Sequence, residues 1–290
     1  MPQVSVVIPT FNRRGMVFEA VESVLCQTWR DWELVVVDDG STDGTAEALE
    51  ARYGDPRVRV VRQENAGASA ARNRGARGTR GELLAFLDSD DTWLPGKLER
   101  QVEALREHRE SPACYTEEIW YRRGRRVNPR TIHAKHGGWI FDRCLPLCII
   151  SPSSILLRRA VFEGLGGFDE SLPACEDYEF WLRLTARHPV HLVAEPLIVK
   201  RNGHAGQLSQ AHWGLDRFRI RALWNVVRDP GVADEQRRSA LECLAAKAAL
   251  VAQGAEKRGE RPRAAVFWHS RKEAIAWLER LSGNSSESQT

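Results

Sequence analysis

The sequence has no CxxC pair, no long apolar run and little net charge, and each of these features limits what the protein can be. Its six cysteines are scattered over 290 residues, so neither a zinc ribbon nor a disulfide framework is indicated, and a reducing cytoplasm is the expected location. The 42 basic and 39 acidic residues give a formal charge of +3, too small to predict a nucleic acid as partner.

Membrane segments and repeats are also missing. No run of about twenty apolar residues is present, and residues 1–10 lack the basic start and long apolar middle of a signal peptide. We therefore expect a soluble, cytoplasmic protein, and peripheral contact with the inner face of the membrane stays open. Apolar residues make up 42% of the chain and charged residues 28%, which is typical of a globular protein and excludes a wholly disordered or collagen-like one.

Short β-branched segments alternate with amphipathic ones over the first 110 residues. Strands are predicted at 4–10, 32–40, 57–61 and 82–88, and helices at about 12–27, 41–53, 67–78 and 94–110. Asn12 is expected to cap the first helix. This order predicts right-handed crossovers and a mainly parallel, doubly wound α/β sheet with flanking helices.

The pattern becomes less regular after residue 110. It predicts a hairpin at 111–129, a strand and short helix at 147–168, a helix at 175–188, a strand at 190–201, and helices at 211–228, 232–257 and 262–281. We expect one domain over 1–210, with halves of about 1–110 and 111–210. A C-terminal helical region over 211–282 and a disordered tail over 283–290 would follow.

The strand predicted at 82–88 ends in three acids within four positions, namely Asp88, Asp90 and Asp91. Residues two apart on an extended strand point the same way, so Asp88 and Asp90 would present two carboxylates to one side. A divalent cation with oxygen ligands, such as Mg²⁺ or Mn²⁺, would relieve their repulsion and also bind substrate phosphates. The alternative is that Asp90, Asp91 and Thr92 only cap and charge the start of the next helix.

Six motifs occur together in a fixed order. They are VSVVIPTFNR (4–13), SVLCQTWRDWELVVVDDGSTDGT (23–45), NAGASAARNRG (65–75), AFLDSDD (85–91), GGFDE (166–170) and EDYEFWLRL (176–184). By these motifs the chain resembles the family 2 glycosyltransferases over residues 3–205. The resemblance implies a Rossmann-like GT-A fold, with a nucleotide-sugar half at 1–110 and an acceptor half at 111–210.

The resemblance also implies a reaction and its partners. A sugar would move with inversion from a nucleoside diphosphate, UDP being expected, to an acceptor hydroxyl in a surface polysaccharide or glycolipid. The partners would be a nucleotide-sugar donor and a glycan or glycolipid acceptor, with no nucleic acid, while oligomerisation stays open. The cofactor would be Mn²⁺ or Mg²⁺, which would stabilise the departing nucleotide.

The resemblance assigns several residues to the nucleotide. They are Pro9, Thr10, Phe11, Asp39, Arg72, Asp88 and Ser89. Asp39 would accept a hydrogen bond from a pyrimidine N–H, since a carboxylate at a strand end is an acceptor. Otherwise Asp38 and Asp39 are turn or cap residues. Arg72 would face the nucleotide or its phosphates from an alanine-rich helix, whereas Asn73 is interpreted as structural.

The same resemblance supplies the metal ligands and the catalytic base. Asp90 and Asp88 would bind the metal together with His204, and Arg201 would help to hold phosphate. Asp177 would take the proton from the acceptor hydroxyl, with Glu176 as the other candidate. Without the resemblance, these two acids would be first-turn residues that interact favourably with the helix dipole.

A basic segment, YRRGRRVNPR (121–130), has two interpretations. A solvated hairpin is the simpler one, and contact with an anionic acceptor or a membrane surface is the other.

Two other functions stay open. A sugar-1-phosphate nucleotidyltransferase would need a glycine-rich, basic loop near the N-terminus, and IPTFNRRG supplies little of it. A catalytically inactive carbohydrate- or nucleotide-binding relative is the second alternative. A dehydrogenase is disfavoured because no GxGxxG follows the first strand.

Overall fold

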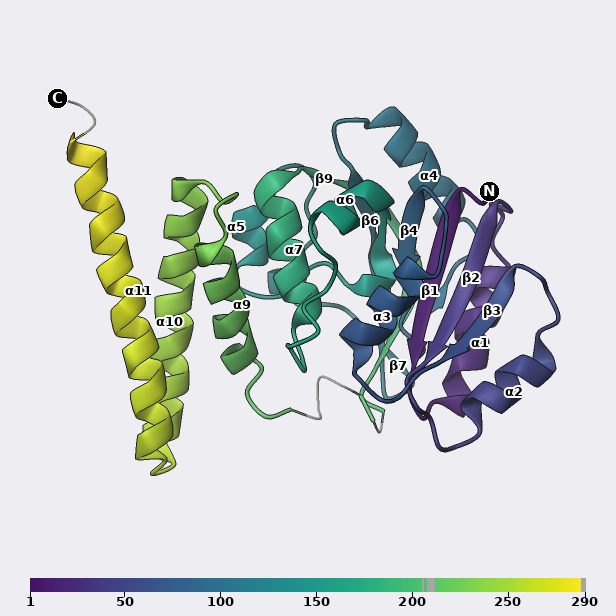
Figure 1. The fold of residues 1–290 in the computed structure, drawn as a ribbon, viewed down its shortest axis with the longest axis horizontal. Helices are drawn as coiled ribbons and strands as arrows, with labels where there is room; N and C mark the ends of the chain where they lie inside the picture. Colours follow the sequence, from purple (N-terminus) through teal and green to yellow (C-terminus); the bar gives the residue numbers. More distant parts are fainter. Residues whose placement is uncertain (205, 208–211, 288–290) are drawn as a thin grey trace. The chain divides into compact units, whose positions relative to one another are not determined.

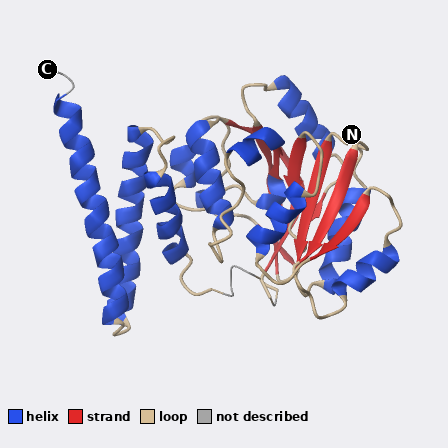
Figure 2. Cartoon of the chain, viewed as in Figure 1, coloured by secondary structure: helices blue, strands red, loops and turns tan. Residues whose placement is uncertain are grey.

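The computed structural model describes residues 1–204, 206–207 and 212–287. The strands are β1 (Val4–Thr10), β2 (Trp32–Asp38), β3 (Val58–Arg62), β4 (Leu83–Phe86), β5 (Thr92–Trp93), β6 (Ala113–Arg122), β7 (Arg125–Val127), β8 (Ile155–Arg158) and β9 (Val190–Asn202). The α-helices are α1 (Arg14–Leu25), α2 (Thr45–Arg52), α3 (Ala68–Arg77), α4 (Lys97–Glu107), α5 (Phe141–Cys144), α6 (Arg159–Gly164), α7 (Glu176–Arg187), α9 (Asp216–Arg228), α10 (Asp234–Lys257) and α11 (Arg261–Glu287), and the short 3-10 helices are η1 (Thr131–His133) and η2 (Pro152–Ser154). Figures 1 and 2 show these elements along the chain.

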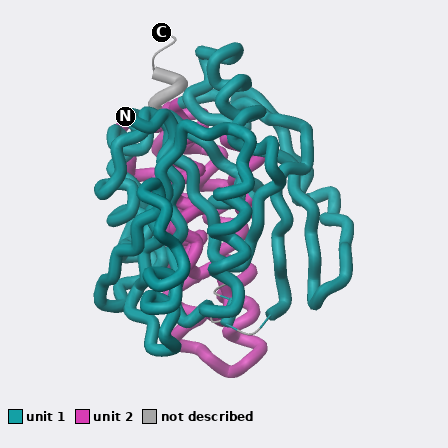
Figure 3. Tube along the Cα trace, turned by 90° about the vertical axis from the view of Figure 1, so that its right-hand side faces the viewer, with its two compact units in different colours: residues 1–140, 149–173, 188–207 teal, residues 141–148, 174–187, 208–290 magenta. Residues whose placement is uncertain are grey.

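The described chain divides into two compact units, coloured separately in Figure 3. The first unit comprises Met1–Ile140, Ile149–Pro173 and His188–Gln207, and it holds the sheet. The second comprises Phe141–Cys148, Ala174–Arg187 and the chain from Leu208 onward, and its described elements are helices. This grouping differs from the predicted boundary at residue 210, because α7 lies before that residue in the chain but packs against α9.

The sheet is built around β1, whose seven residues are all buried. Among the described residues the strand order is β3-β2-β1-β4-β8-β6-β9-β5, with β7 paired to β6. β1 pairs in parallel with β2 and β4, and β2 pairs in parallel with β3. The predicted α/β alternation is therefore confirmed, and the carboxyl ends of these four strands share one edge of the sheet, where ligands bind in such folds.

The rest of the sheet adds antiparallel strands to this parallel half. β8 lies antiparallel between β4 and β6, and β5 is antiparallel to β9. Because two antiparallel pairings restore the direction, β6 runs the same way as β4, and β9 is parallel to β6. The carboxyl ends of β6 and β9 therefore reach the same edge as those of β1, β2 and β4.

The start of the first helix differs from the prediction. α1 begins at Arg14, and Asn12 does not cap it, because Asn12 has a positive φ of 50° and its side-chain oxygen accepts from the backbone N–H of Thr42. Asp43 supplies the cap in its place by accepting from the N–H of Arg14 at 3.2 Å. The loop after β2 thus holds the entry to α1.

The helix α3 lies against β1 and β2, and one glycine permits this contact. A Cβ at Gly75 would lie 2.3 Å from a methyl carbon of Val7, closer than any side chain could be tolerated. The close approach fixes α3 on the sheet and so fixes the residues at its first turn, beside the ligand edge.

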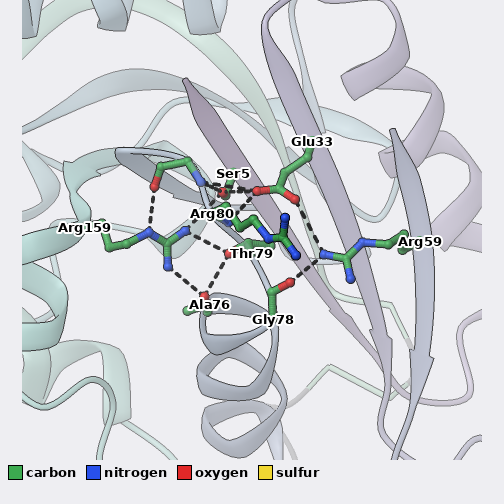
Figure 4. A network of polar contacts seen from close by, with 9 residues as sticks. Ser5, Glu33, Arg59, Ala76, Gly78, Thr79, Arg80 and Arg159 are labelled. Atoms are coloured by element: carbon green, nitrogen blue, oxygen red, sulfur yellow. Dashed lines mark hydrogen bonds and ion pairs between the residues drawn. The ribbon is translucent and has the colours of Figure 1, made fainter. Parts of the chain in front are cut away.

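At the opposite end of β1, a polar network joins the strands to α3 and α6 (Figure 4). The carboxylate of Glu33 accepts from Ser5 and from the backbone of Arg80, at 2.8 and 2.6 Å. The guanidinium of Arg159 donates to the Ala76 carbonyl and to the Thr79 hydroxyl. These bonds satisfy polar groups at the amino ends of the strands, away from the ligand edge.

The second unit is held together by helix packing and by loop contacts. α7 packs against α5 and α9, and α10 packs against α9 and α11. The carbonyl of Leu145 accepts from the Tyr178 hydroxyl at 2.6 Å and from the Cys243 thiol at 3.2 Å. None of the described helices combines the length and the apolar character needed to cross a membrane.

The C-terminal helix is longer than predicted. A disordered tail was expected over residues 283–290, but α11 continues through Glu287, and 288–290 lie outside the described residues. A polar composition favours disorder, but serine and glutamate do not prevent a helix from continuing once the preceding turns are formed.

Candidate active site

Three carboxylates gather at the carboxyl end of β4. Oxygens of Asp88, Asp90 and Asp91 all lie within 4.8 Å of one another, which is compatible with one metal ion. Their arrangement differs from the expected one, because β4 ends at Phe86 and the acids follow on a turn closed by the Asp91 N–H and the Asp88 carbonyl at 3.0 Å. The turn, rather than strand alternation, brings the carboxylates together.

Asp90 is the carboxylate that protein cations surround. Its Oδ2 lies 2.5 Å from Nη1 of Arg13 and 2.7 Å from Nε2 of His204. Asp90 and His204, both predicted as metal ligands, thus lie in direct contact. Arg13 was not predicted, although it stands in the IPTFNR motif a few residues after β1.

Asp91 is the buried member of the cluster, with 3% of its surface exposed. Its oxygens accept from the Ser153 hydroxyl at 2.7 Å and from the backbone N–H of Arg201 at 3.0 Å. Burial, with the charges of Asp90 and Asp88 added to it, raises the pKa of Asp91 well above its usual value. The alternative interpretation had Asp91 only charge the start of the next helix, whereas in the structure it ties β9 and η2 to the turn at 88–91, the acidic turn.

Asp88 joins the acidic turn to α3. Its Oδ1 accepts from Nη2 of Arg72 at 2.6 Å, and its N–H donates to the Ser153 hydroxyl at 3.1 Å. Arg72 is buried, and its guanidinium also lies 5.5 Å from the ring centre of Phe168. The predicted nucleotide residues Arg72 and Asp88 are therefore neighbours, and Ser153 is a third partner that the sequence did not reveal.

Asn73, next to Arg72, clamps the GGFDE segment. Its side chain donates to the Phe168 carbonyl at 2.8 Å and accepts from the Phe168 N–H at 2.9 Å. Gly167 has a φ of 73°, and a Cβ there would lie 2.7 Å from the Asn73 oxygen. These contacts are those of a structural residue, the role predicted for Asn73.

Asp39 organises the loop before α3. Its carboxylate accepts from the Gln63 amide at 2.6 Å and from the N–H groups of Ala66 and Gly67, both at 2.9 Å. Three bonds occupy most of the roughly four lone-pair positions of a carboxylate, so about one stays available for a ligand. The sequence suggested a base-binding acid, and the structure adds that Asp39 holds this loop.

Two buried polar atoms face the same edge without a protein partner. Thr10 and Asp38 are opposite each other in the β1–β2 register. Oγ1 of Thr10 and Oδ2 of Asp38 are buried and make no hydrogen bond with the described part of the chain. Such atoms are rare in native structures unless a ligand or water satisfies them. Of the other predicted nucleotide residues, Pro9 and Ser89 are buried and Phe11 is 45% exposed.

A pocket of about 310 Å³ lies beside His204 in the first unit. It is lined by Met16, Tyr121, Arg123, Gly124, Val199, Arg201, Asn202, Gly203 and His204. Two of the basic side chains in this lining contact acids outside it. Arg201 pairs with Glu19 at 2.5 Å, and His204 pairs with Asp90. The lining contains no acidic side chain.

The candidate base lies in the second unit, in the first turn of α7. Oδ2 of Asp177 accepts from the thiol of Cys148 at 3.3 Å, and Oδ1 accepts from the N–H of Tyr178 at 2.7 Å. Glu176 is buried, with 5% of its surface exposed. Cys148 was not predicted as a site residue, because it lies 29 positions before Asp177 and no local pattern links the two.

Comparison with known proteins identifies the class. The family model described as "Glycosyl transferase family 2" matches residues 5–166, and "Glycosyltransferase like family 2" matches residues 139–221. The chain is 30% identical to the Escherichia coli UDP-Glc:alpha-D-GlcNAc-diphosphoundecaprenol beta-1,3-glucosyltransferase WfgD, over 78% of this chain and 85% of that protein. An uncharacterised glycosyltransferase of Rickettsia felis is 32% identical over 72% of this chain and 35% of its own length.

Solved structures agree on the fold. TarS residues 1–349 from S. aureus, in complex with UDP-GlcNAc, superposes with a TM-score of 0.74 at 20% identity, covering 96% of this chain and 84% of that one. A Pyrobaculum calidifontis mannosyltransferase in complex with GDP-Man and Mn²⁺ gives 0.63 at 20% identity, covering 97% and 84%.

The fold and the acidic turn thus define a GT-A glycosyltransferase. The chain belongs to glycosyltransferase family 2, as its motifs predicted. It spans about a third of the length of the Rickettsia felis relative, so what the whole protein acts on is a matter of proposal.

Proposed function

We propose that the protein is a metal-dependent, inverting glycosyltransferase that moves a sugar from a UDP-sugar to an acceptor hydroxyl in the synthesis of a surface polysaccharide or glycolipid. The observation that carries the proposal is the group of three carboxylates within 4.8 Å at the ligand edge, flanked by Arg13, Arg72 and His204. Acids and cations placed together suit a site that holds both a metal ion and a diphosphate.

Two observations support UDP as the nucleotide: the nucleotides named for relatives, and polar atoms at the ligand edge that could bind a base or ribose. WfgD is named for UDP-Glc, and TarS was solved with UDP-GlcNAc and with UDP. The polar atoms that a base or ribose could satisfy are the remaining acceptor position of Asp39, Oγ1 of Thr10 and Oδ2 of Asp38. Ser89, Pro9 and Phe11 complete the proposed nucleotide set.

The donor atoms fit Mn²⁺ or Mg²⁺. The cluster offers carboxylate oxygens from Asp88 and Asp90, and His204 offers a ring nitrogen, a set that oxygen-preferring cations accept and that manganese tolerates especially well. Oδ1 of Asp90 makes no hydrogen bond with the described residues, so it is free to bind a metal. Bound there, the cation would supply positive charge to a leaving diphosphate.

Asp177 is the proposed base, with Glu176 as the second candidate. The acceptor hydroxyl cannot release its proton unaided at neutral pH. A positioned carboxylate can take this proton as the hydroxyl attacks the sugar. The two hydrogen bonds from Cys148 and from the backbone of Tyr178 fix the carboxylate of Asp177. One base acting in a single displacement agrees with inversion. A cytoplasmic location with peripheral contact at the inner membrane face is part of this proposal.

Equilibrium binding of UDP and turnover of UDP-sugars, each measured with and without Mn²⁺, test the proposal. We expect wild-type protein to bind UDP tightly only with metal, Asp90→Asn to lose this binding, and Asp177→Asn to keep it. Both variants would lose turnover by about a hundredfold or more, the usual contribution of a general base or an electrostatic group. Metal-dependent UDP binding that survives in Asp90→Asn would overturn the metal assignment. Pyrophosphate release from UTP and a sugar phosphate would indicate a nucleotidyltransferase.

A further inference from the structure

The β6–β7 hairpin carries a concentrated positive charge. We name residues 121–130 the arginine hairpin; its arginines are Arg122, Arg123, Arg125, Arg126 and Arg130. All of them are exposed, and no acidic residue occurs between Glu118 and Asp142. Within the described ranges, none of these arginines forms an ion pair with an acid. By contrast, Arg13, Arg72 and Arg201 at the ligand edge are each paired with an acid, so the charge of the hairpin is available to a partner.

The topology brings this hairpin to the ligand edge. β6 runs in the direction of β4, so the turn that follows it lies at the edge that also carries the acidic turn. The N–H of Arg123 donates to the Asn202 carbonyl at 3.0 Å, at the end of β9. A Cβ at Gly203 would lie 3.1 Å from Cγ of Arg123, which places the hairpin directly against this glycine. The next residue, His204, contacts Asp90.

The pocket of about 310 Å³ lies between the hairpin and His204. Tyr121, Arg123 and Gly124 line it from the hairpin, and Met16 lines it from α1. Its volume is at the lower end of the range for small-molecule sites, about 300–1,000 Å³. The lining combines apolar surface with cationic groups; Arg201 and His204 are paired with Glu19 and Asp90, whereas Arg123 forms no ion pair with a described acid. It therefore suits an anionic group with an organic substituent better than a metal or a neutral sugar alone.

Arginine side chains are especially well suited to binding phosphate. The guanidinium group donates two parallel hydrogen bonds to phosphate, and it is less strongly hydrated than an ammonium group. Charges separated by less than a Debye length of about 8 Å reinforce one another, so adjacent arginines create a strongly positive surface. A hairpin whose charges served only solubility could carry acidic and basic residues together, and it would not need a pocket at its base.

From these contacts we infer that the arginine hairpin and its pocket bind the phosphate groups of the acceptor substrate. The acceptor is thus a sugar carried on a phosphate or diphosphate, and the donor's own diphosphate binds at the acidic turn. The inference rests on the proposed glycosyltransferase function and names its acceptor class. The positive charge of the hairpin favours phosphate as the ligand. The hairpin also lies close to Asp90 at the proposed active site, which favours a substrate over a membrane contact far from the reaction.

The test compares two matched quadruple variants. The hairpin variant changes Arg122, Arg123, Arg125 and Arg126 to Gln; the control changes Arg261, Arg271, Lys272 and Arg280, exposed cations of α11, to Gln. The probes are a sugar diphosphate with a short alkyl chain and the same alkyl glycoside without phosphate. Binding is measured by calorimetry at several salt concentrations, together with UDP binding in Mn²⁺.

We expect wild-type protein to prefer the diphosphate probe, and the hairpin variant to bind it at least about tenfold more weakly, with UDP binding unchanged. The control variant would match wild type. Equal affinity of the hairpin variant and wild type would overturn the inference. Loss of binding to phosphatidylglycerol vesicles, with full affinity for the probe retained, would also overturn it by showing a membrane contact. Absence of metal-dependent UDP binding in wild type would instead refute the proposed function.

Discussion

The guanidinium of Arg13 lies 2.5 Å from Oδ2 of Asp90, the carboxylate oxygen that His204 also contacts. Arg13 comes from the loop after β1, and Asp90 from the turn after β4, so the pair joins neighbouring strands at the ligand edge. Both side chains are mostly buried, with 16% and 14% exposed, which limits screening by solvent. Arg13 therefore neutralises the carboxylate that is proposed to hold the metal.

The first prediction concerns this competition. Arg13→Ala should bind Mn²⁺ alone about tenfold more tightly than wild type, because Asp90 loses a competing cation worth about 1.4 kcal/mol. Free Mn²⁺ is measured by electron paramagnetic resonance. Arg14→Ala removes a neighbouring exposed arginine and should leave metal affinity unchanged. Weaker metal binding by Arg13→Ala would show that Arg13 orients Asp90 and does not compete for it.

The second prediction concerns Ser153, which bonds both Asp91 and the backbone of Asp88. Ser153→Ala should unfold more easily by about 1–3 kcal/mol, because a buried acceptor loses its donor. It should also bind UDP with Mn²⁺ about tenfold more weakly, since the acidic turn loses its shape. The control is Ser154→Ala, whose hydroxyl bonds the Ser151 carbonyl and no other group of the described residues. Equal losses of UDP affinity in the two variants would count against a positioning role.

The third prediction concerns the thiol beside the proposed base. Cys148→Ala should lower kcat by about fivefold, because the carboxylate of Asp177 loses one hydrogen bond from a weak thiol donor, worth about 1 kcal/mol, and the donor KM should stay unchanged. Cys148→Ser should restore much of the rate, because a hydroxyl also donates. Cys243→Ala, which removes a thiol bonded to the Leu145 carbonyl, is the control. A change in donor KM with kcat intact would exclude this role for Cys148.

The parallel half of the fold was predictable because its signals are local. Each of β1, β2 and β4 is a short, mostly apolar and buried segment, and apolar residues recur with a period of 3.6 along the helices between them. The insertion of β8 between β4 and β6 was not predictable, because it depends on pairing between segments more than 70 positions apart, as for Leu83 and Arg158. Strand order is decided by tertiary packing, which a linear pattern does not encode.

In the candidate site, too, local features were predictable and contacts between distant segments were not. Asp39, Asp88 and Asp90 can be recognised in the sequence because each follows closely after an apolar segment that predicts a buried strand. Their partners do not stand out, since Ser153 lies 62 positions from Asp91. The Asn12 prediction failed for a related reason, because Asp43, in the loop after a different strand, supplies the cap. Residue types were therefore predictable from the sequence, whereas the hydrogen bonds that position them required the structure.

The last prediction uses Lys97, whose side chain is fully buried beside Gln101 and over the ring of Trp93. Burial lowers the pKa of Lys97 from 10.5 to about 7, against the opposing influence of Cys114. Between these pH values the unfolded chain binds a proton that the native protein lacks. The free energy of unfolding should therefore rise with pH, by up to about 1.4 kcal/mol per unit, and level off below pH 7.

Urea unfolding between pH 6 and about 10 measures this contribution as the difference between wild type and Lys97→Met. The methionine variant keeps the length of the side chain and has no proton to lose, so its free energy of unfolding should lack the rise that wild type shows above pH 7. Lys272→Met, at an exposed position of α11, should keep the rise. If Lys97→Met retained the full slope, Lys97 would be charged in the native protein at pH 8, and its amine would need a buried anionic partner. The hydrogen bond from Lys97 to the neutral Gln101 amide, 2.6 Å long, supplies no such charge.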